Sequence, residues 1–179
     1  MDKIKKMSTV LKYVFWLLLI LIPLTESLGW ILFDGFDGWA VPDVLFSLEG
    51  ENFPLELSMT SRLLGMLATS PCVLLDMFCV WQMMRLFSLY SQGRIFTGEN
   101  SSCYRRAAWA LLGSEILYPL VQAGASLAVS MDNPVGERFV SIGFNDANLG
   151  SIVVACVVLA VSWVMDEGRK LQEDAELTI

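Results

Sequence analysis

Four long apolar stretches dominate the chain, and short polar segments separate them. They run from about Tyr13 to Phe33, Leu63 to Leu86, Ala107 to Val129 and Leu149 to Met165. A helix that crosses the hydrocarbon core of a membrane needs about 20 mostly apolar residues. Lipid cannot satisfy free backbone polar groups, and no series of alternating barrel strands is present. The pattern predicts an all-α integral membrane protein, with residues 1–179 forming one domain and a bundle of four transmembrane helices.

The first apolar stretch also has some features of a cleaved signal peptide. Lysines within residues 3–6 form a basic front, and the small residues Ser27 and Gly29 follow the apolar core. The apolar run nevertheless resumes over residues 28–32. We therefore expect this segment to be retained as the first span.

Composition narrows the classes of function. The chain is 55% hydrophobic and 17% charged, whereas soluble domains are about 45–50% apolar and about 25% charged. It contains no histidine, the commonest general base and metal ligand. No phosphate-binding loop, nucleophile elbow, metal-ligand set or C-x-x-C pair is found. We expect no enzymatic activity, no metal and no cofactor, and we interpret Cys72, Cys79, Cys103 and Cys156 as packing residues.

The basic residues are distributed very unevenly between the two sides of the predicted bundle. Ten lie in the N-terminal segment, around the middle loop and in the tail, and only Arg62 and Arg138 lie on the other side. Lysine and arginine favour the cytoplasmic side of a membrane. We therefore predict that both termini and the middle loop face the cytoplasm of a bacterium, with the chain in its inner membrane. The basic residues are few and placed for topology, so direct nucleic-acid binding is not expected.

Three carboxylic acids fall within the predicted spans, namely Glu26, Asp76 and Glu115. No lysine or arginine lies near the middle of any span, so an obvious cationic partner is lacking. A buried acid in a membrane indicates either a proton- or cation-sensing cluster or an interhelical hydrogen bond that fixes packing. Both interpretations stay open for Asp76 and Glu115, and packing is favoured for Glu26. Candidate hydrogen-bond partners are Thr69, Ser114, Tyr118 and Gln122.

Two further features each allow two interpretations. The first outer loop, over residues 34–60, mixes acids with aromatic residues, which suits either a capture surface for cations or peptides or a solvated loop with interfacial anchors. We favour the solvated loop. Small residues at four-residue spacing, Ala110 with Ser114 and Ser151 with Ala155, allow close helix approach within the bundle or in a homo-oligomer. We favour the bundle.

Two polar segments carry a family resemblance. The first is Gly93-Arg94-Ile95-Phe96-Thr97, just after the second span, and the second is the tail from Gly168 through Leu171 to Glu176-Leu177-Thr178-Ile179. In order and spacing they resemble the bacterial DUF2975 family of small four-helix membrane proteins. The resemblance implies a membrane protein without an assigned activity. Members are often encoded beside a small helix-turn-helix regulator, which implies a cytoplasmic transcription regulator as partner.

These segments also have a direct physical interpretation. Gly93 can adopt a positive φ and end the second helix. Thr97 is a candidate N-cap for the following helix, with Asn100 and Ser101 as rivals. We expect the fourth helix to continue to about Glu173 and to be followed by an extended apolar end.

In that apolar end, Leu177 and Ile179 either fill a groove of a partner or pack back beside Phe96. We favour packing beside Phe96, because both segments lie on the same membrane face.

Three functional hypotheses follow. The first is a non-enzymatic regulator or sensor whose cytoplasmic face binds a soluble partner. The second is a small proton- or cation-coupled transporter that works as an oligomer and depends on Asp76 and Glu115. The third is a structural membrane subunit.

Overall fold

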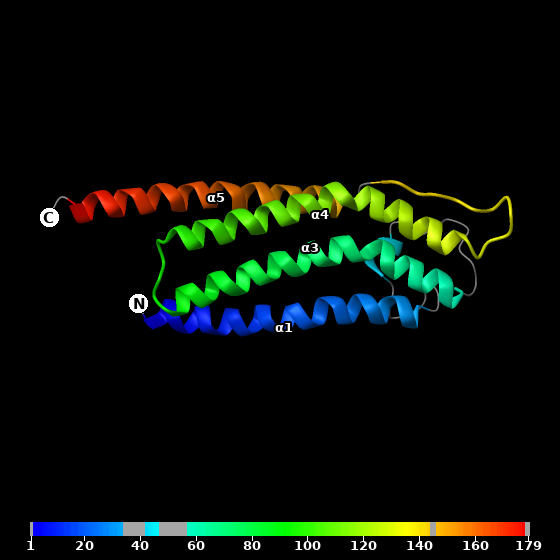
Figure 1. Cartoon of the computed structure of the whole chain (residues 1–179), viewed down its shortest axis with the longest axis horizontal. Helices are drawn as coiled ribbons and strands as arrows, with labels where there is room; N and C mark the ends of the chain where they lie inside the picture. The colour runs from blue at the N-terminus through cyan, green and yellow to red at the C-terminus, as the bar shows by residue number, and fades with distance from the viewer. Residues whose placement is uncertain (1, 34–41, 47–56, 144–145, 178–179) are drawn as a thin grey trace. The chain divides into compact units, whose positions relative to one another are not determined.

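Four long helices and one short helix make up the secondary structure in the computed structural model (Figure 1), which describes residues 2–33, 42–46, 57–143 and 146–177. They are α1 (Asp2–Leu32), α2 (Asp43–Phe46), α3 (Met59–Ser91), α4 (Gly98–Ser130) and α5 (Asp146–Leu177). No strand occurs in those residues. The predicted all-α fold is therefore confirmed, and each apolar stretch lies on its own long helix, except that Phe33 follows the last residue of α1.

Three of the helices contain stretches long and apolar enough to cross a membrane: Lys3–Leu32, Met59–Ser91 and Asn148–Leu171. Their apolar side chains mostly point outward, and Leu67, Leu74 and Val164 are 69%, 64% and 70% exposed. Water would penalise such a surface, whereas lipid would not. The chain is thus a helical membrane protein. Helix α4 does not reach the same apolarity, so the fourth span stays a prediction.

The chain divides into two compact units, which are described separately. Unit 1 comprises Met1–Ile20, Asp76–Gly113 and Gly150–Ile179, and unit 2 comprises Leu21–Leu75 and Ser114–Leu149. The prediction of a single domain is not tested by this division. All ten basic residues assigned to the cytoplasmic side belong to unit 1, and the other two belong to unit 2.

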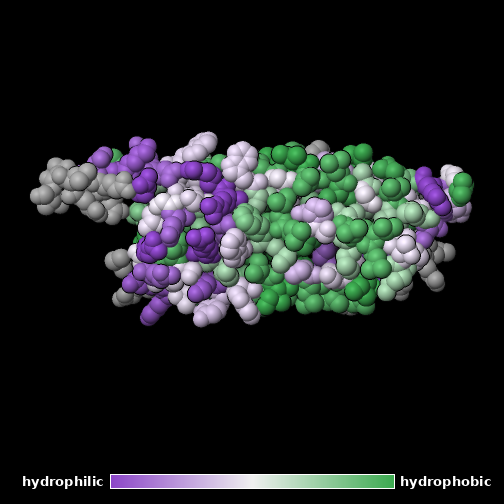
Figure 2. Space-filling model, viewed as in Figure 1, coloured by the Kyte–Doolittle hydropathy of each residue, from purple (hydrophilic) through white to green (hydrophobic). Residues whose placement is uncertain are grey.

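Unit 1 is held together by aromatic and apolar contacts among α1, α3 and α4. The rings of Phe15 and Phe87 stack with their centroids 5.4 Å apart. The hydroxyl groups of Tyr90 and Tyr104 form a hydrogen bond of 3.1 Å between α3 and α4. On the face of unit 1 shown in Figure 2, hydrophilic residues gather at the end that carries the α3–α4 turn. That end is therefore the part of unit 1 best suited to water.

Unit 2 has a buried apolar core that includes part of the first outer loop. Trp30 and Leu45 are completely buried, and Val44 is nearly so. The other core members are Phe33, Leu57, Val121, Ala125 and Val129. Val44 and Leu45 belong to the first outer loop, which we expected to be solvated, but they pack inward from α2. The remaining loop positions from 34 to 41 and from 47 to 56 lie outside the described residues.

A close approach between α1 and α3 depends on Gly65. A methyl group at this position would overlap the six-membered ring of Trp30. The absence of a side chain at Gly65 therefore lets the Trp30 indole lie directly against the α3 backbone. The indole nitrogen is satisfied within α1, because it donates a hydrogen bond of 3.0 Å to Glu26.

The segment between α4 and α5, which is the second outer loop of the predicted topology, returns along α4 and is held there by hydrogen bonds with three polar side chains. Ser130 Oγ donates to the Phe139 carbonyl at 2.9 Å, and Ser126 Oγ accepts from the Ser141 amide at 3.0 Å. Gln122 Oε1 accepts from the Gly143 amide at 2.6 Å. Four helical residues advance about 6.0 Å and two extended residues about 6.6 Å, so the two spacings match.

The sequence analysis did not predict this arrangement. Ser130, Ser126 and Gln122 also make the C-terminal part of α4 less apolar than the other predicted spans. Unpaired backbone groups cannot be left in lipid. The three side chains therefore allow non-helical chain to lie beside α4.

Candidate functional site

The turn between α3 and α4 begins with Gly93, which has a φ of +83°. The Gly93 amide donates to the Tyr90 carbonyl at 3.0 Å, and the Arg94 amide donates to the Leu89 carbonyl at 3.1 Å. This pair of hydrogen bonds is the Schellman ending of a helix, in which glycine supplies the left-handed conformation. The structure thus confirms that Gly93 ends the helix of the second span.

Thr97 occupies the N-cap position of α4, but its side chain does not act as a cap. Its carbonyl accepts from the Asn100 amide at 3.0 Å. Its hydroxyl oxygen is buried and makes no hydrogen bond to any described residue. The prediction of the position was correct, whereas the expected side-chain hydrogen bond is not formed.

Asn100, which we considered only as a rival cap, instead fixes the turn. It is completely buried, and its side-chain nitrogen donates to the carbonyls of Arg94 and Ile95. A buried amide that satisfies two loop carbonyls holds those residues in one conformation. The shape of the motif from Gly93 to Thr97 therefore depends on a side chain three residues beyond it.

The structure brings the turn and helix α5 together within unit 1. A methyl group at Gly168 would lie 3.7 Å from the Phe96 ring. Arg105 of α4 forms an ion pair with Asp166 of α5. The two segments that carry the family resemblance are therefore in contact through Phe96 and Gly168, although half of the Phe96 surface stays exposed.

The tail differs from the expected extended end. Helix α5 continues to Leu177, so residues 174–177 are helical. The tail contains no proline or glycine after Gly168 that would stop the helix, so α5 continues. Leu171 is 64% exposed. The side chains of Glu176 and Leu177, as well as Thr178 and Ile179, lie outside what the structure describes, so neither prediction for the apolar end is tested.

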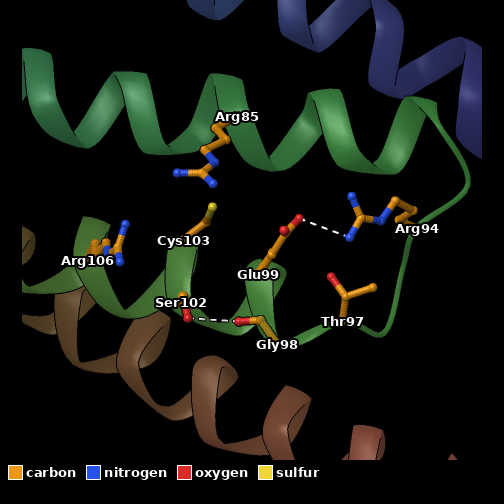
Figure 3. A pocket seen from close by; sticks show the side chains of 8 residues that line it. All are labelled: Arg85, Arg94, Thr97, Gly98, Glu99, Ser102, Cys103 and Arg106. Carbon is orange, nitrogen blue, oxygen red and sulfur yellow. Dashed lines mark hydrogen bonds and ion pairs between the residues drawn. The ribbon is translucent and has the colours of Figure 1, made fainter.

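A cavity of about 440 Å³ opens between the end of α3 and the beginning of α4 (Figure 3). Its lining residues are Arg85, Arg94, Thr97, Gly98, Glu99, Ser102, Cys103 and Arg106. The sequence analysis counted these arginines only for topology and missed the cavity. Their grouping around the Gly93–Thr97 motif is the signal that points to it.

The charges in this cavity are not balanced. Arg94 and Glu99 form an ion pair of 3.1 Å. Arg85 and Arg106 have no carboxylate within ion-pair distance among the described residues. Figure 3 shows the Cys103 thiol pointing towards Arg85. Burial raises the pKa of Cys103, and the nearby guanidinium groups of Arg85 and Arg106 only partly oppose this, so the environment favours the protonated, less reactive thiol.

The three predicted intramembrane acids all have partners. Glu26 accepts the indole hydrogen bond of Trp30, and Glu115 accepts a hydrogen bond of 2.6 Å from the side-chain amide of Asn148. Asp76 also has an interacting partner. Asp76 belongs to unit 1, and the other two acids belong to unit 2. Among the candidate partners, Gln122 binds the Gly143 amide and Ser114 accepts the Cys72 thiol at its carbonyl.

Gln82 is a buried polar side chain that the sequence analysis did not single out. Gln82 of α3 is completely buried in unit 1, and neither its oxygen nor its nitrogen has a hydrogen-bond partner among the described residues. Leaving such a group unsatisfied costs about 1–3 kcal/mol. No group of three or more cysteine or acidic side chains in the described ranges is arranged to hold a metal ion, and all four cysteines are free.

The comparisons with known proteins agree with the resemblance carried by the two motifs. A family model described as "Protein of unknown function (DUF2975)" matches residues 5–179. No curated protein and no solved structure matches the chain. The family match covers nearly the whole chain, including the arginine-lined cavity and α5.

Proposed function

The chain belongs to the DUF2975 family of proteins of unknown function, and from this premise we propose that it is a non-enzymatic regulator in the bacterial inner membrane. It crosses the membrane four times, and both termini face the cytoplasm. Its cytoplasmic surface binds a soluble partner of the helix-turn-helix type. The association of the family with such regulators supports the kind of partner.

The charge distribution supports the orientation. Ten of the twelve basic residues belong to unit 1, which contains both ends of the chain and the α3–α4 turn. This bias is the one that places segments on the cytoplasmic side. A reporter fused after Ile179 is expected to be active in the cytoplasm, and activity only in the periplasm would overturn the orientation.

Exposed apolar side chains support α4 as a fourth span. Ile116 and Leu120 on α4 are 71% and 69% exposed, and Trp109 near the beginning of the apolar stretch is 61% exposed. Lipid is the surrounding in which such residues are stable, and an indole ring suits the membrane interface. Four spans also place both termini on one side.

The observation that carries the regulatory proposal is the contact between the α3–α4 turn and α5. Phe96 packs against Gly168, and Arg105 pairs with Asp166. Helix α5 extends beyond its apolar stretch to Leu177. The turn and the polar end of α5 thus make one joint surface, which a ligand or a change in the membrane could alter for a partner to detect.

A pull-down from membranes in mild detergent tests this proposal. Four forms are compared: the full chain, a deletion of Glu176–Ile179, the contact variant Phe96→Ala and the control Val135→Ala. Val135 is 92% exposed in the second outer loop and should not affect a cytoplasmic partner. We expect the full chain and the Val135→Ala control to retain a soluble DNA-binding protein. The deletion, the Phe96→Ala variant or both should lose it. Identical partner lists for all four forms would remove this surface from the proposal.

Proton- or cation-coupled transport is the alternative function. The hydrogen bond between Glu115 and Asn148 favours a packing role for that acid. A flux assay in liposomes with the wild type and Asp76→Asn separates the two functions. Flux that the Asp76→Asn variant loses would support transport, and an absence of flux in both forms would support regulation or a structural role.

A further inference from the structure

We propose that the cavity at the beginning of α4 binds a phosphate group, supplied by an anionic lipid headgroup or by a free phosphate compound. The proposal does not depend on the soluble partner. It rests on the unbalanced arginines, the buried hydroxyl of Thr97 and the end of a long helix.

The arginines supply the charge and the geometry. Arg85 projects from α3 and Arg106 from α4, and both line the cavity without a described acidic partner. A guanidinium group donates two parallel hydrogen bonds to a phosphate and stays charged at any physiological pH. A phosphate monoester carries about −1.5 to −2 charges near pH 7, and a phosphodiester headgroup such as that of phosphatidylglycerol carries about −1, so the two free arginines can balance either charge.

The Thr97 hydroxyl supplies a hydrogen-bond donor that nothing else uses. Its oxygen is buried and unpartnered among the described residues, and Figure 3 shows it directed into the cavity. Ser102, the other hydroxyl in the lining, already donates to the Gly98 carbonyl at 2.8 Å. A buried hydroxyl without a partner is costly, so a bound acceptor would remove the cost.

Helix α4 adds its own attraction for an anion. The first amides of a helix have no acceptor within the helix, and Gly98 at the first position lines the cavity. The helix dipole makes this end positive. Asn100 fixes the preceding turn, so the amide and the hydroxyl are held in place before any ligand binds.

Glu99 acts as an internal competitor. In the structure its carboxylate neutralises Arg94 at 3.1 Å. A phosphate that enters the cavity competes with this carboxylate for Arg94. Removing the Glu99 charge should therefore strengthen phosphate binding, which general damage to the fold would not do.

The size of the cavity agrees with this ligand class. Ligand pockets are usually about 300–1,000 Å³, and the volume of about 440 Å³ admits a phosphate ester with a few waters. The cavity belongs to the hydrophilic end of unit 1, where lipid headgroups and soluble phosphates would both have access.

The test uses the full chain in neutral detergent and in nanodiscs. In the first arm, inorganic phosphate or pyrophosphate is titrated by calorimetry. In the second arm, native mass spectrometry counts the lipids retained from phosphatidylcholine discs with and without phosphatidylglycerol. Saturable binding in the first arm alone assigns a free phosphate, and selective retention of phosphatidylglycerol alone assigns a headgroup. Binding in neither arm overturns the proposal.

Matched variants distinguish a built site from general surface charge. Arg85→Gln and Arg106→Gln should each weaken binding about tenfold or more, and Arg106→Lys should recover part of it. Lys6→Gln removes one positive charge from an exposed position of unit 1 outside the cavity, and should change binding less than about twofold. Glu99→Gln should tighten binding by about threefold or more.

Circular dichroism checks that each variant keeps its helix content. If the arginine variants do not fold, the tighter phosphate binding expected for Glu99→Gln remains as the test. An equal loss in Lys6→Gln, or no tightening in Glu99→Gln, would overturn the proposal.

Discussion

Asn148, at the beginning of α5, donates a side-chain hydrogen bond of 2.6 Å to Glu115 in the middle of α4. The two residues are 33 positions apart in the sequence and belong to the same compact unit. This hydrogen bond joins the two helices directly. It gives the acid of the predicted third span a structural partner.

Replacing Glu115 with glutamine should preserve this contact, whereas replacing it with leucine should not. The side-chain carbonyl introduced by Glu115→Gln can still accept from Asn148, so we expect a free energy of unfolding within about 0.5 kcal/mol of the wild type. Glu115→Leu should lose about 1–2 kcal/mol. Thermal unfolding in detergent measures both. Equal destabilisation by the two variants would show that the charge itself is required and would favour the transport hypothesis.

The contact of Trp30 with Gly65 predicts a steric effect. Gly65→Ala should destabilise unit 2 by about 1–3 kcal/mol, because its methyl group overlaps the buried indole. Gly150→Ala is the matched control, since nothing lies within 4 Å of a methyl group there. It should be neutral or stabilise α5 by up to about 1 kcal/mol. Midpoints of thermal unfolding that fall equally for both variants would contradict this.

The unsatisfied amide of Gln82 predicts a stabilising substitution. Methionine has nearly the same shape and needs no hydrogen bond, so Gln82→Met should raise the free energy of unfolding by about 1–3 kcal/mol. Denaturant titration in mixed micelles measures the change. A loss of stability would mean that Gln82 holds a water molecule or another ligand, and would make it a candidate site residue.

Asp132, which belongs to unit 2, predicts that the stability of the folded state depends on pH. Its carboxylate accepts a hydrogen bond of 2.7 Å from the Ser58 amide, just before α3. Partial burial raises the pKa of Asp132, but the hydrogen bonds from the Ser58 amide and from the Ser61 and Ser58 hydroxyls outweigh it and lower the pKa below 3.8.

Because the folded pKa is the lower one, Asp132 stabilises the folded state above the unfolded pKa of about 3.9, and this contribution disappears as the pH falls through the folded value. The unfolding midpoint of the wild type should therefore exceed that of Asp132→Asn at pH 7 and approach it near pH 3. A difference that stays constant over this range would contradict the assignment.

The sequence predicted those features that have a local signature. Apolar length located the four long helices, and Gly93 marked the end of α3 because only glycine easily adopts its φ. Thr97 marked the beginning of α4. The end of α5 was placed too early, since a polar helix that leaves the membrane continues without an apolar period to reveal it.

The missed features depend on contacts between distant segments. Asn100 looks like a capping residue in sequence, but the tertiary structure turns its amide back onto two carbonyls. Arg85 and Arg106 favour the cytoplasmic side of a membrane whether or not they line one cavity, so their positions in the sequence do not reveal it. The inward packing of Val44 and Leu45 also depends on core partners from other helices. Hydrophobic periodicity contains no information about these relationships.

The hydrogen bonds that hold the second outer loop against α4 determine which substitutions the protein tolerates in both segments. Ser126, Ser130 and Gln122 bind backbone atoms of the loop, so these bonds do not depend on which residues occupy positions 139, 141 and 143. A complete mutational scan should find the helical positions restrictive and the loop positions permissive. Proline is the exception at 141 and 143, where it deletes the donating amide.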